Sequence, residues 1–350
     1  MRFSRGTYAF IATLGGSSMM RLPSIRALHP TVVPTMMMRH STRVFLSSSS
    51  SSFQAPEPPT SKAQSIFPDV DLTASITESA RQRNSDPNAV FLVNGSSRGI
   101  GLQMVKSLVE RTQGTIVACC RTPDDPTSPL QQYLQSLSPT LQERIHTVPL
   151  DLQNQTSIDA LGDYLKTTTT MHSNNRLDGL FNVAGVLGDG STTPGPERSL
   201  ARLERQWLEH TLQVNLVGHV MLIQALQRLL KSNIQKEDRP TSVIVNLSAR
   251  VGSIADNELG GWYSYRMSKA ALNQATRTMA HELKRQGTCA IAVHPGTTDT
   301  DLSKPFQKNV RAEKLFPVDF TVDQILDVVD RIDDTHTGGL YDWAGKAIPF

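Results

Sequence analysis

Gly95-Ser96-Ser97-Arg98-Gly99-Ile100-Gly101 separates an uninterrupted apolar run, residues 89–93, from an amphipathic stretch, residues 102–110. An apolar run without alternation is typical of a strand that is buried on both faces. In the stretch that follows, apolar residues recur at the spacing of one helix face. Backbone N–H groups at a helix N-terminus bind phosphate, and the helix dipole favours negative charge there. The sequence therefore predicts a strand, a glycine turn and a helix that together bind a dinucleotide.

The three glycines of this turn have separate predicted roles. Gly95 is expected to permit the turn itself, and Gly99 the close approach of the pyrophosphate. Gly101 is expected to let the helix pack against the strand. A glycine pattern alone is weak evidence, but this one lies between the first strand and the first helix, which is the context that a dinucleotide site requires.

The same alternation of apolar and amphipathic stretches continues along the body of the chain. Long helical patterns cover residues 203–230 and 263–285. Strands that alternate with helices predict parallel βαβ units, and hence an α/β fold with a doubly wound parallel sheet, the Rossmann fold, as a single domain over 87–350. The further predicted strands are 115–120, 145–150, 177–183, 242–247 and 290–293.

The first 56 residues differ from this body in composition. They contain no Asp or Glu but do contain six arginines, and a serine run occupies residues 47–52. This composition is typical of an organelle transit peptide, so we expect an unstructured leader over 1–56 and a linker over 57–86. A mitochondrial matrix destination is favoured, with a plastid as the alternative. If the leader is an ordinary tail, the protein is cytoplasmic.

The charge of the body argues against a nucleic-acid-binding protein. The chain has 35 basic and 32 acidic residues, and without the six leader arginines the basic count falls to 29. A slightly acidic body has no basic face for nucleic acid, and no apolar run is long enough to span a bilayer. Cys119, Cys120 and Cys289 have no metal-ligand spacing and are too few for a disulfide framework. No metal site is predicted.

Local charge favours NADP(H) over NAD(H). A 2′-phosphate is bound by arginine, whereas a 2′-hydroxyl is bound by a carboxylate at the end of the second strand. Arg121 follows that strand, and Arg98 lies within the glycine turn. Guanidinium groups match phosphate geometry in a bidentate manner. The alternative is that Arg121 only solvates a loop that also holds Asp124 and Asp125.

Tyr265 and Lys269 are the candidates for acid–base chemistry. Their spacing of four residues stacks them on one helix face. A free tyrosine titrates near pH 10, and we expect the lysine ammonium, with the positive nicotinamide of the oxidised cofactor, to lower that pKa. Tyr265 is then the general acid in carbonyl reduction and the general base in alcohol oxidation. Tyr263 lies on another face and is interpreted as a pocket wall.

Ser248 is placed to supply a second hydrogen bond to the reacting carbonyl. It ends the predicted strand 242–247, at the sheet edge where substrates bind. Asn215 lies on the long helical pattern, and taken alone it reads as a structural asparagine that needs partners. His294 is interpreted as a packing residue, because Tyr265 already supplies the acid.

With these residues in place, the body resembles a short-chain dehydrogenase/reductase of the compact, single-domain kind. Within that family it is similar to the C-factor and sniffer-like carbonyl reductases. The resemblance covers nearly all of 87–350. The motifs that carry it are the glycine turn, Asn182-Val183-Ala184-Gly185, Gly260-Gly261-Trp262-Tyr263-Ser264-Tyr265, Lys269, the stretch from His294 to Phe306, and the tail from Tyr341 to Phe350. Val183 and Thr298 depart from the usual pattern, and the stretch between Ser248 and Tyr265 is longer than in many members.

The resemblance implies an enzyme, an NADPH-dependent oxidoreductase that reduces an aldehyde or ketone. Its implied catalytic residues are Asn215, Ser248, Tyr265 and Lys269, and Asn215 is implied to hold a water that links Lys269 to solvent. The implied cofactor-binding residues are Gly95, Ser97, Arg98, Gly99, Ile100, Gly101, Arg121, Asp151, Leu152, Asn182, Ala184, Gly185, Tyr265, Lys269, Pro295, Gly296, Thr298 and Thr300.

Other functions and partners stay open at this point. One alternative is a non-catalytic signalling or redox-sensing protein that binds the dinucleotide, and another is a sugar-nucleotide epimerase or dehydratase. The complete catalytic set argues against the first, and the short stretch after Pro295 argues against the second. Segments 186–197, 251–261 and 304–316 are expected to line the site of a neutral, modestly apolar carbonyl compound. Family analogy implies a homodimer or homotetramer formed through the two long helices.

Overall fold

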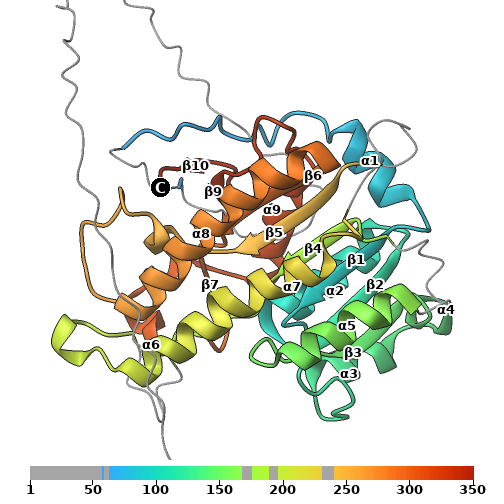
Figure 1. The fold of residues 1–350 in the computed structure, drawn as a ribbon, viewed down its shortest axis with the longest axis horizontal. Helices are drawn as coiled ribbons and strands as arrows, with labels where there is room; N and C mark the ends of the chain where they lie inside the picture. The colour runs from blue at the N-terminus through green and yellow to red at the C-terminus, as the bar shows by residue number, and fades with distance from the viewer. Residues whose placement is uncertain (1–56, 59–62, 168–175, 189–195, 231–239) are drawn as a thin grey trace, which may run out of the picture. The chain divides into compact units, whose positions relative to one another are not determined.

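The structure is a computed structural model, and it describes the chain except residues 1–56, 59–62, 168–175, 189–195 and 231–239 (Figure 1). The predicted leader, residues 1–56, lies outside the described residues. So does part of one segment expected to line the substrate, residues 189–195. No helix in the described part of the chain is long and apolar enough to cross a membrane.

An eight-stranded sheet forms the centre of the domain. Its strands are parallel, apart from the antiparallel pair β9 and β10 at one edge. In order across the sheet they are β10 (Ala347–Ile348), β9 (Leu340–Asp342), β6 (Thr288–His294), β5 (Ser242–Leu247), β4 (Gly179–Asn182), β1 (Val90–Asn94), β2 (Thr115–Cys120) and β3 (Ile145–Pro149). The order from β3 to β6 is that of a doubly wound fold, which reverses between β1 and β4. The predicted α/β fold is confirmed.

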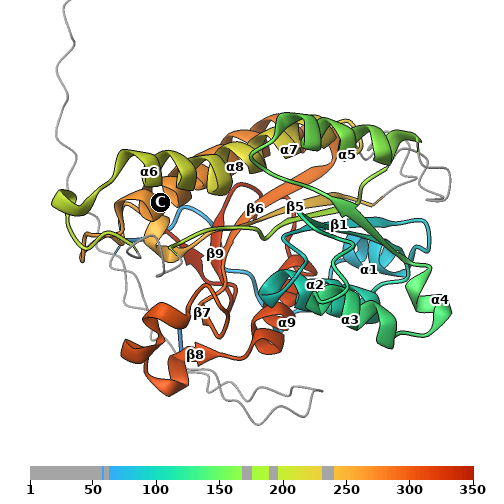
Figure 2. The ribbon, with the colours of Figure 1, turned by 90° about the horizontal axis from the view of Figure 1, so that it is seen from below.

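Helices cover both faces of the sheet (Figure 2). One layer consists of α2 (Gly99–Arg111), α3 (Pro129–Ser136) and α9 (Val318–Val329). The other consists of α5 (Gln155–Thr167), α7 (Gly218–Leu226) and α8 (Tyr263–Leu283). The remaining α-helices of the described residues are α1 (Glu78–Ser85), α4 (Pro139–Gln142) and α6 (Arg205–Leu212).

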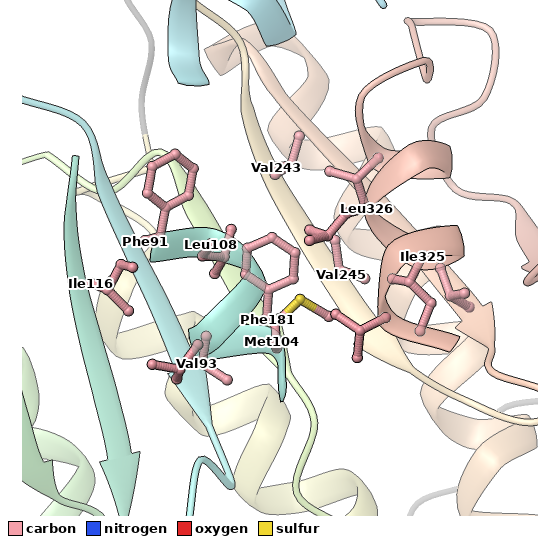
Figure 3. Packing of buried hydrophobic residues seen from close by; sticks show 14 of the residues in the cluster. Phe91, Val93, Met104, Leu108, Ile116, Phe181, Val243, Val245, Ile325 and Leu326 are labelled. Atoms are coloured by element: carbon pink, nitrogen blue, oxygen red, sulfur yellow. The ribbon is translucent and has the colours of Figure 1, made fainter. Parts of the chain in front are cut away.

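The two layers explain the apolar run that precedes the glycine turn. Phe91 and Val93 pack into the cluster formed with α2 and α9 (Figure 3). Val90 and Leu92 pack into the cluster formed with α5 and α7. Each of the four side chains is at most 1% exposed. Because successive residues of a strand point to opposite faces, a strand covered on both sides needs apolar residues at every position.

The helix predicted over 203–230 is interrupted. After α6 the chain forms a π-helical turn, Gln213–Val217, and then continues as α7. Asn215 lies in the middle of this wide turn. π-Helical turns are rare and frequently occur at functional sites. Helical periodicity alone did not reveal the interruption, because the apolar spacing continues through it.

Part of the segment predicted to be a linker packs onto the domain. Val70 is 4% exposed and joins the same core cluster as Phe91. Its N–H donates to the Gly345 carbonyl over 2.8 Å. The Arg83 side chain of α1 is buried and donates to the Thr241 carbonyl over 3.1 Å. The polar and proline-rich composition of 57–86 concealed these few buried anchors, and the packed domain begins earlier than residue 87.

Three buried asparagines connect the carboxyl ends of β1, β4 and β5. Asn94, Asn182 and Asn246 occupy one register position across the three strands. Asn94 Nδ2 donates to Asn182 Oδ1 over 2.6 Å, and Asn182 Nδ2 donates to Asn246 Oδ1 over 2.7 Å. Asn246 Nδ2 then donates to Thr276 Oγ1 of α8 over 2.8 Å. This asparagine ladder fixes the strand ends at the edge where ligands bind.

The substitution Asn182→Ala should destabilise the domain. It removes the middle of the ladder and leaves polar atoms of Asn94 and Asn246 buried without these partners. Each unsatisfied buried group costs about 1–3 kcal/mol, so we expect the free energy of unfolding to fall by about 2–4 kcal/mol. Chemical denaturation followed by circular dichroism measures this loss. Asn88→Ala, at an exposed position, is the control. Equal stability of the two variants would contradict a structural role for the ladder.

Candidate active site

The structure brings the predicted site residues to one edge of the sheet. Gly95 follows β1, Asn182 ends β4, Ser248 follows β5 and Pro295 follows β6. Tyr265 and Lys269 lie on the first turns of α8, which packs over β6. These elements meet beyond the carboxyl ends of the strands, next to the reversal between β1 and β4, where a doubly wound sheet binds its ligand.

The glycine turn has the geometry that phosphate binding requires. Gly95 has φ of +77°, and a Cβ there would lie 2.8 Å from Ala184 Cα. At Gly101 a Cβ would overlap with the Gly95 carbonyl oxygen, so the helix packs directly on the turn. No side chain caps the N-terminus of α2. Because that end has no capping side chain, its first N–H groups fit an anionic ligand such as a pyrophosphate.

The residues predicted near the adenine and its ribose lie around this turn. The Arg98 side chain is 68% exposed and lies 3.6 Å from the Asp301 carboxylate, measured from Nε to Oδ2. Arg121 is exposed at the end of β2. Asp151 is half-buried and its N–H is bonded to Ser157 Oγ over 3.0 Å, while Leu152 is buried. Both guanidinium groups are therefore accessible to a phosphate from solvent.

The Asn215 side chain holds the start of the loop after β4. Its Nδ2 donates to the Val186 carbonyl and its Oδ1 accepts from the Val186 N–H, both over 2.8 Å. Nδ2 also lies 3.2 Å from Ser268 Oγ on α8. The asparagine is fully buried, so its amide is paired in the way that a buried amide must be. These bonds give the Asn215 amide the partners that the structural interpretation requires, and its implied role in holding a water stays a prediction.

Tyr265 and Lys269 lie together, and burial shifts both toward their neutral forms. Lys269 Nζ is 5.6 Å from the centre of the Tyr265 ring and donates to the Leu247 carbonyl over 2.7 Å. Burial lowers the pKa of Lys269 to about 7. Burial raises the pKa of the Tyr265 phenol above its ordinary value. For the protein alone, desolvation of the phenolate dominates, and the expectation that the lysine and the positive nicotinamide together lower the phenol pKa stays a prediction.

Ser248 is bonded to a residue that the sequence analysis did not single out. Its Oγ donates to Asn273 Oδ1 over 2.6 Å, and both residues are 2% exposed. Asn273 follows Lys269 by four residues, as Lys269 follows Tyr265, so one helix face carries all three. This repeated spacing is the signal that could have identified Asn273.

Trp262 and Glu197 shape the start of α8. Trp262 has φ of +55°, which is uncommon for a bulky residue. The centre of its ring lies 6.3 Å from that of Tyr265, in an edge-on arrangement, and 5.5 Å from that of Phe306, in a tilted one. The Glu197 carboxylate accepts the Ser264 N–H over 3.2 Å as well as the Ser264 hydroxyl. A carboxylate at a helix N-terminus is stabilising, and here it ties a distant loop to the helix that carries Tyr265.

The segment after β6 is fixed by a second, two-stranded sheet. In this sheet β7 (Thr297–Thr298) pairs in parallel with β8 (Leu315–Phe316). Thr298 is 4% exposed, and its Oγ1 lies 2.9 Å from Thr321 Oγ1 of α9. The threonine that departs from the usual family pattern therefore has a hydroxyl partner in this chain. Thr300 lies against the glycine turn, since a Cβ at Gly99 would be 3.4 Å from Thr300 Cγ2.

Two histidines near the site, the buried His219 and the half-buried His294, are neutral near pH 7. Burial, and to a smaller extent the charge of Arg250, lowers the pKa of His294 to about 3. Burial and the charge of Lys269 lower the pKa of His219 to about 3. His219 Nε2 is bonded to the Ala184 carbonyl over 2.8 Å. Neither histidine supplies a proton at neutral pH, and the described residues contain no cluster that fits a metal ion.

Comparison with known proteins agrees with this geometry. The family described as short chain dehydrogenase matches residues 89–311. A curated relative, the 1-hydroxy-2-glutathionyl-2-methyl-3-butene dehydrogenase of Rhodococcus sp. strain AD45, is 28% identical over 62% of this chain and 81% of its own. The NADPH-bound carbonyl reductase from chicken fatty liver is 28% identical with a TM-score of 0.62, covering 75% of this chain and 99% of its own. The carbonyl reductase Sniffer of D. melanogaster is 27% identical with a TM-score of 0.63, covering 76% and 100%.

The low pKa of Lys269 predicts a pH-dependent stability of the protein without cofactor. The unfolded chain binds a proton at this lysine up to its ordinary pKa of 10.5, whereas the folded protein releases it near pH 7. Since the unfolded state then binds more protons, the free energy of unfolding rises with pH. Between about pH 7 and about pH 8.5 the rise should approach 1.4 kcal/mol per pH unit.

Urea unfolding across this pH range measures the slope. Lys269→Met is the matched comparison, because methionine keeps an unbranched apolar stem and does not titrate. The difference in slope between the two proteins isolates the lysine from every other titrating group. Parallel slopes would show that Lys269 keeps its ordinary pKa in the folded protein.

Proposed function

Because the chain belongs to the short-chain dehydrogenase family and is of the sniffer and carbonyl reductase type, we propose that it reduces an aldehyde or ketone to an alcohol with NADPH. Membership of the family makes it an NAD(P)-dependent oxidoreductase. The observation that carries the finer proposal is that Tyr265, Ser248 and Lys269 lie at the same edge of the sheet as the glycine turn. A proton donor, a second hydroxyl and a nucleotide site thus meet at one edge of the sheet.

The residues present fit a nicotinamide dinucleotide. The uncapped N-terminus of α2 would hold the pyrophosphate, with Gly99 allowing its close approach and Gly95 and Gly101 forming the tight turn beneath it. The segment from Pro295 to Thr300 would hold the carboxamide side of the nicotinamide. When bound, the reduced cofactor supplies a hydride to the carbonyl carbon. Every other part of the reaction falls to side chains of this chain.

Tyr265 is proposed as the general acid. A phenol with a raised pKa is protonated at neutral pH, so the form that donates is the populated one. It would give its proton to the carbonyl oxygen as negative charge develops there. A pKa of about 7 lets Lys269 exchange protons near neutrality, which suits a group that returns a proton to the tyrosine.

Ser248 is proposed to hold the same carbonyl oxygen. Two hydrogen-bond donors aimed at one developing oxyanion stabilise the transition state more than either alone. Its position after β5 is fixed by a bond from its own N–H to the Val293 carbonyl over 2.8 Å. A serine buried this firmly is preorganised and does not need to reorient its backbone during the reaction.

The use of NADPH rests on charge at the far end of the same site. Arg121 and Arg98 are exposed near the predicted position of the 2′-phosphate. Arginine binds phosphate through paired N–H groups, and such charged hydrogen bonds are stronger than neutral ones. The chicken carbonyl reductase, whose structure contains NADPH, is a similar protein. Arg98 also has Asp301 as a neighbour, so Arg121 is expected to contribute more to discrimination.

The substitution Tyr265→Phe should abolish turnover. The purified protein is assayed for NADPH oxidation against aldehydes, ketones and quinones. Loss of a general acid lowers kcat by roughly 100-fold to 10,000-fold, while NADPH binding, followed by fluorescence, should persist. Tyr133→Phe, which removes the same hydroxyl from α3, where the ring lies beside Lys106 of α2, should leave turnover unchanged. Full activity of the Tyr265 variant would exclude tyrosine as the acid. Binding of NADPH without turnover of any compound would favour the sensor alternative.

The substitution Arg121→Ala should weaken the preference for NADPH. Loss of one charged hydrogen bond to phosphate is worth about 1.5–3 kcal/mol, so the KM for NADPH should rise roughly 10-fold or more. The KM for NADH should stay the same, because NADH has no 2′-phosphate. Arg285→Ala, at an exposed position, controls for the change in net charge. A wild-type protein that prefers NADH would overturn the assignment.

A further inference from the structure

We propose that Asn273 is a positioning residue that controls the direction of the Ser248 hydroxyl proton, and that it donates to Ser248 when a carbonyl substrate is bound. The inference rests on the proposed function, since it concerns how Ser248 serves that reaction. It assigns a role to a buried side chain that lies outside both the glycine turn and the pair formed by Tyr265 and Lys269.

The starting observation is the pairing of two buried polar side chains. Ser248 Oγ and Asn273 Oδ1 are 2.6 Å apart, with the serine donating. On the other side of the same amide, Asn273 Nδ2 is buried and has no hydrogen-bond partner among the described residues. Buried amide donors are normally paired. In this arrangement the oxygen of Asn273 accepts a hydrogen bond, but its NH₂ group donates none.

The proton count of Ser248 makes this arrangement unsuitable for carbonyl binding. A serine hydroxyl has one proton and two lone pairs, and a carbonyl oxygen is purely an acceptor. While the proton of Ser248 is given to Asn273, only lone pairs face the substrate. Ser248 then repels the carbonyl oxygen that it is meant to hold. The reaction therefore requires the proton of Ser248 to be released from Asn273.

A half-turn of the Asn273 amide releases that proton. The oxygen and the NH₂ group of an amide occupy nearly the same space, so the rotation needs little rearrangement of packing. Nδ2 then donates to Ser248 Oγ, and the serine proton becomes free to donate to the carbonyl. The rotation also gives the buried NH₂ group of Asn273 a hydrogen-bond acceptor. It leaves the amide oxygen unpaired instead, which is better tolerated than an unpaired N–H.

The surrounding bonds keep the two residues at a fixed separation. On either side of Asn273, α8 is bonded to the end of β5 through Thr276 with Asn246 and through Lys269 with Leu247. Neither bond involves the Ser248 or Asn273 side chain. The amide can therefore change its orientation while strand and helix stay in place, which is the property that a positioning residue needs.

The test uses Asn273→Asp and Asn273→Ala, each alone and combined with Ser248→Ala. In Asn273→Asp, the new side chain as a carboxylate can only accept hydrogen bonds. The Ser248 hydroxyl therefore donates its hydrogen bond to this carboxylate and not to the substrate. As a protonated carboxyl, the new side chain can donate as the rotated amide does. We therefore expect kcat of Asn273→Asp, relative to wild type, to fall as pH rises through the carboxyl pKa. At high pH it should approach the roughly 100-fold loss typical of removing an oxyanion donor, as in Ser248→Ala.

Asn273→Ala leaves the proton on Ser248 but removes the hydrogen-bond partner of that hydroxyl. The decrease in kcat of this variant should therefore be smaller, roughly 10-fold or less, and independent of pH. In the Ser248→Ala background, both Asn273 substitutions should change kcat less than about threefold, because there is no hydroxyl left to direct. The ratio to wild type removes the titration of Tyr265, Lys269 and His294, which all variants share. NADPH binding and circular dichroism report whether each variant is folded.

The outcomes separate this inference from the proposed function. If wild type shows no turnover that depends on Tyr265, the proposed function fails and the inference fails with it. If wild type turns over substrate, the proposed function stands and the inference about Asn273 is tested separately. The inference is overturned if the Asn273 substitutions lower kcat by the same factor in the Ser248→Ala background as in the wild-type background. A relative kcat of Asn273→Asp that does not vary with pH also overturns it. If Asn273→Asp does not fold, the double-mutant cycle of Asn273→Ala with Ser248→Ala decides, because additive effects on kcat would again overturn the inference.

Discussion

The three hydrogen bonds between the end of β5 and α8, called here the join, are the constraint on which the candidate site depends. Three consecutive residues at this strand end are each bonded to the helix. Asn246 donates to Thr276, the Leu247 carbonyl accepts from Lys269, and Ser248 donates to Asn273. Polar groups buried under a covered parallel sheet must find partners within the protein. Here the same partners that satisfy them also set the distance between the serine and the helix of Tyr265.

The join also extends sideways to the nucleotide turn. From Asn246 the asparagine ladder runs through Asn182 to Asn94, whose Oδ1 accepts the Ala184 N–H over 2.9 Å. Ala184 in turn lies against Gly95, at the beginning of the glycine turn. The hydrogen-bonded ladder therefore reaches from the helix that carries the candidate acid–base residues to Ala184, which packs against the first residue of the glycine turn. Preorganisation of this kind lets polar groups stabilise developing charge without reorganising during the reaction.

Sequence reasoning located the parts of this unit that have local signals. The glycine turn is contiguous, and Tyr265 and Lys269 are four residues apart, so spacing alone predicts both. Asn273 was missed, and Glu197 was expected only as the end of a segment lining the substrate site, because their partners are 25 and 67 residues away along the chain. The π-helical turn at Asn215 was missed because it preserves apolar spacing. Val70 and Arg83 were assigned to a linker because a few buried anchors do not change the composition of a polar segment.

The side chains that surround the candidate site come from loops and from the C-terminal segment, whereas the candidate reacting groups lie directly after β5 and on α8. Trp262 and Phe306 pack beside Tyr265, and the C-terminal residues bond to the loop after Ser248 through Ser253 with Pro349 and Ala255 with Phe350. Leu259 of that loop is 92% exposed, so its apolar side chain is not committed to the core. None of these residues belongs to the ladder or to the join with α8. The shape of the proposed substrate site can therefore change through its loops while the hydrogen-bonded ladder and the bonds between β5 and α8 stay constant, as expected where loops on a rigid scaffold carry specificity.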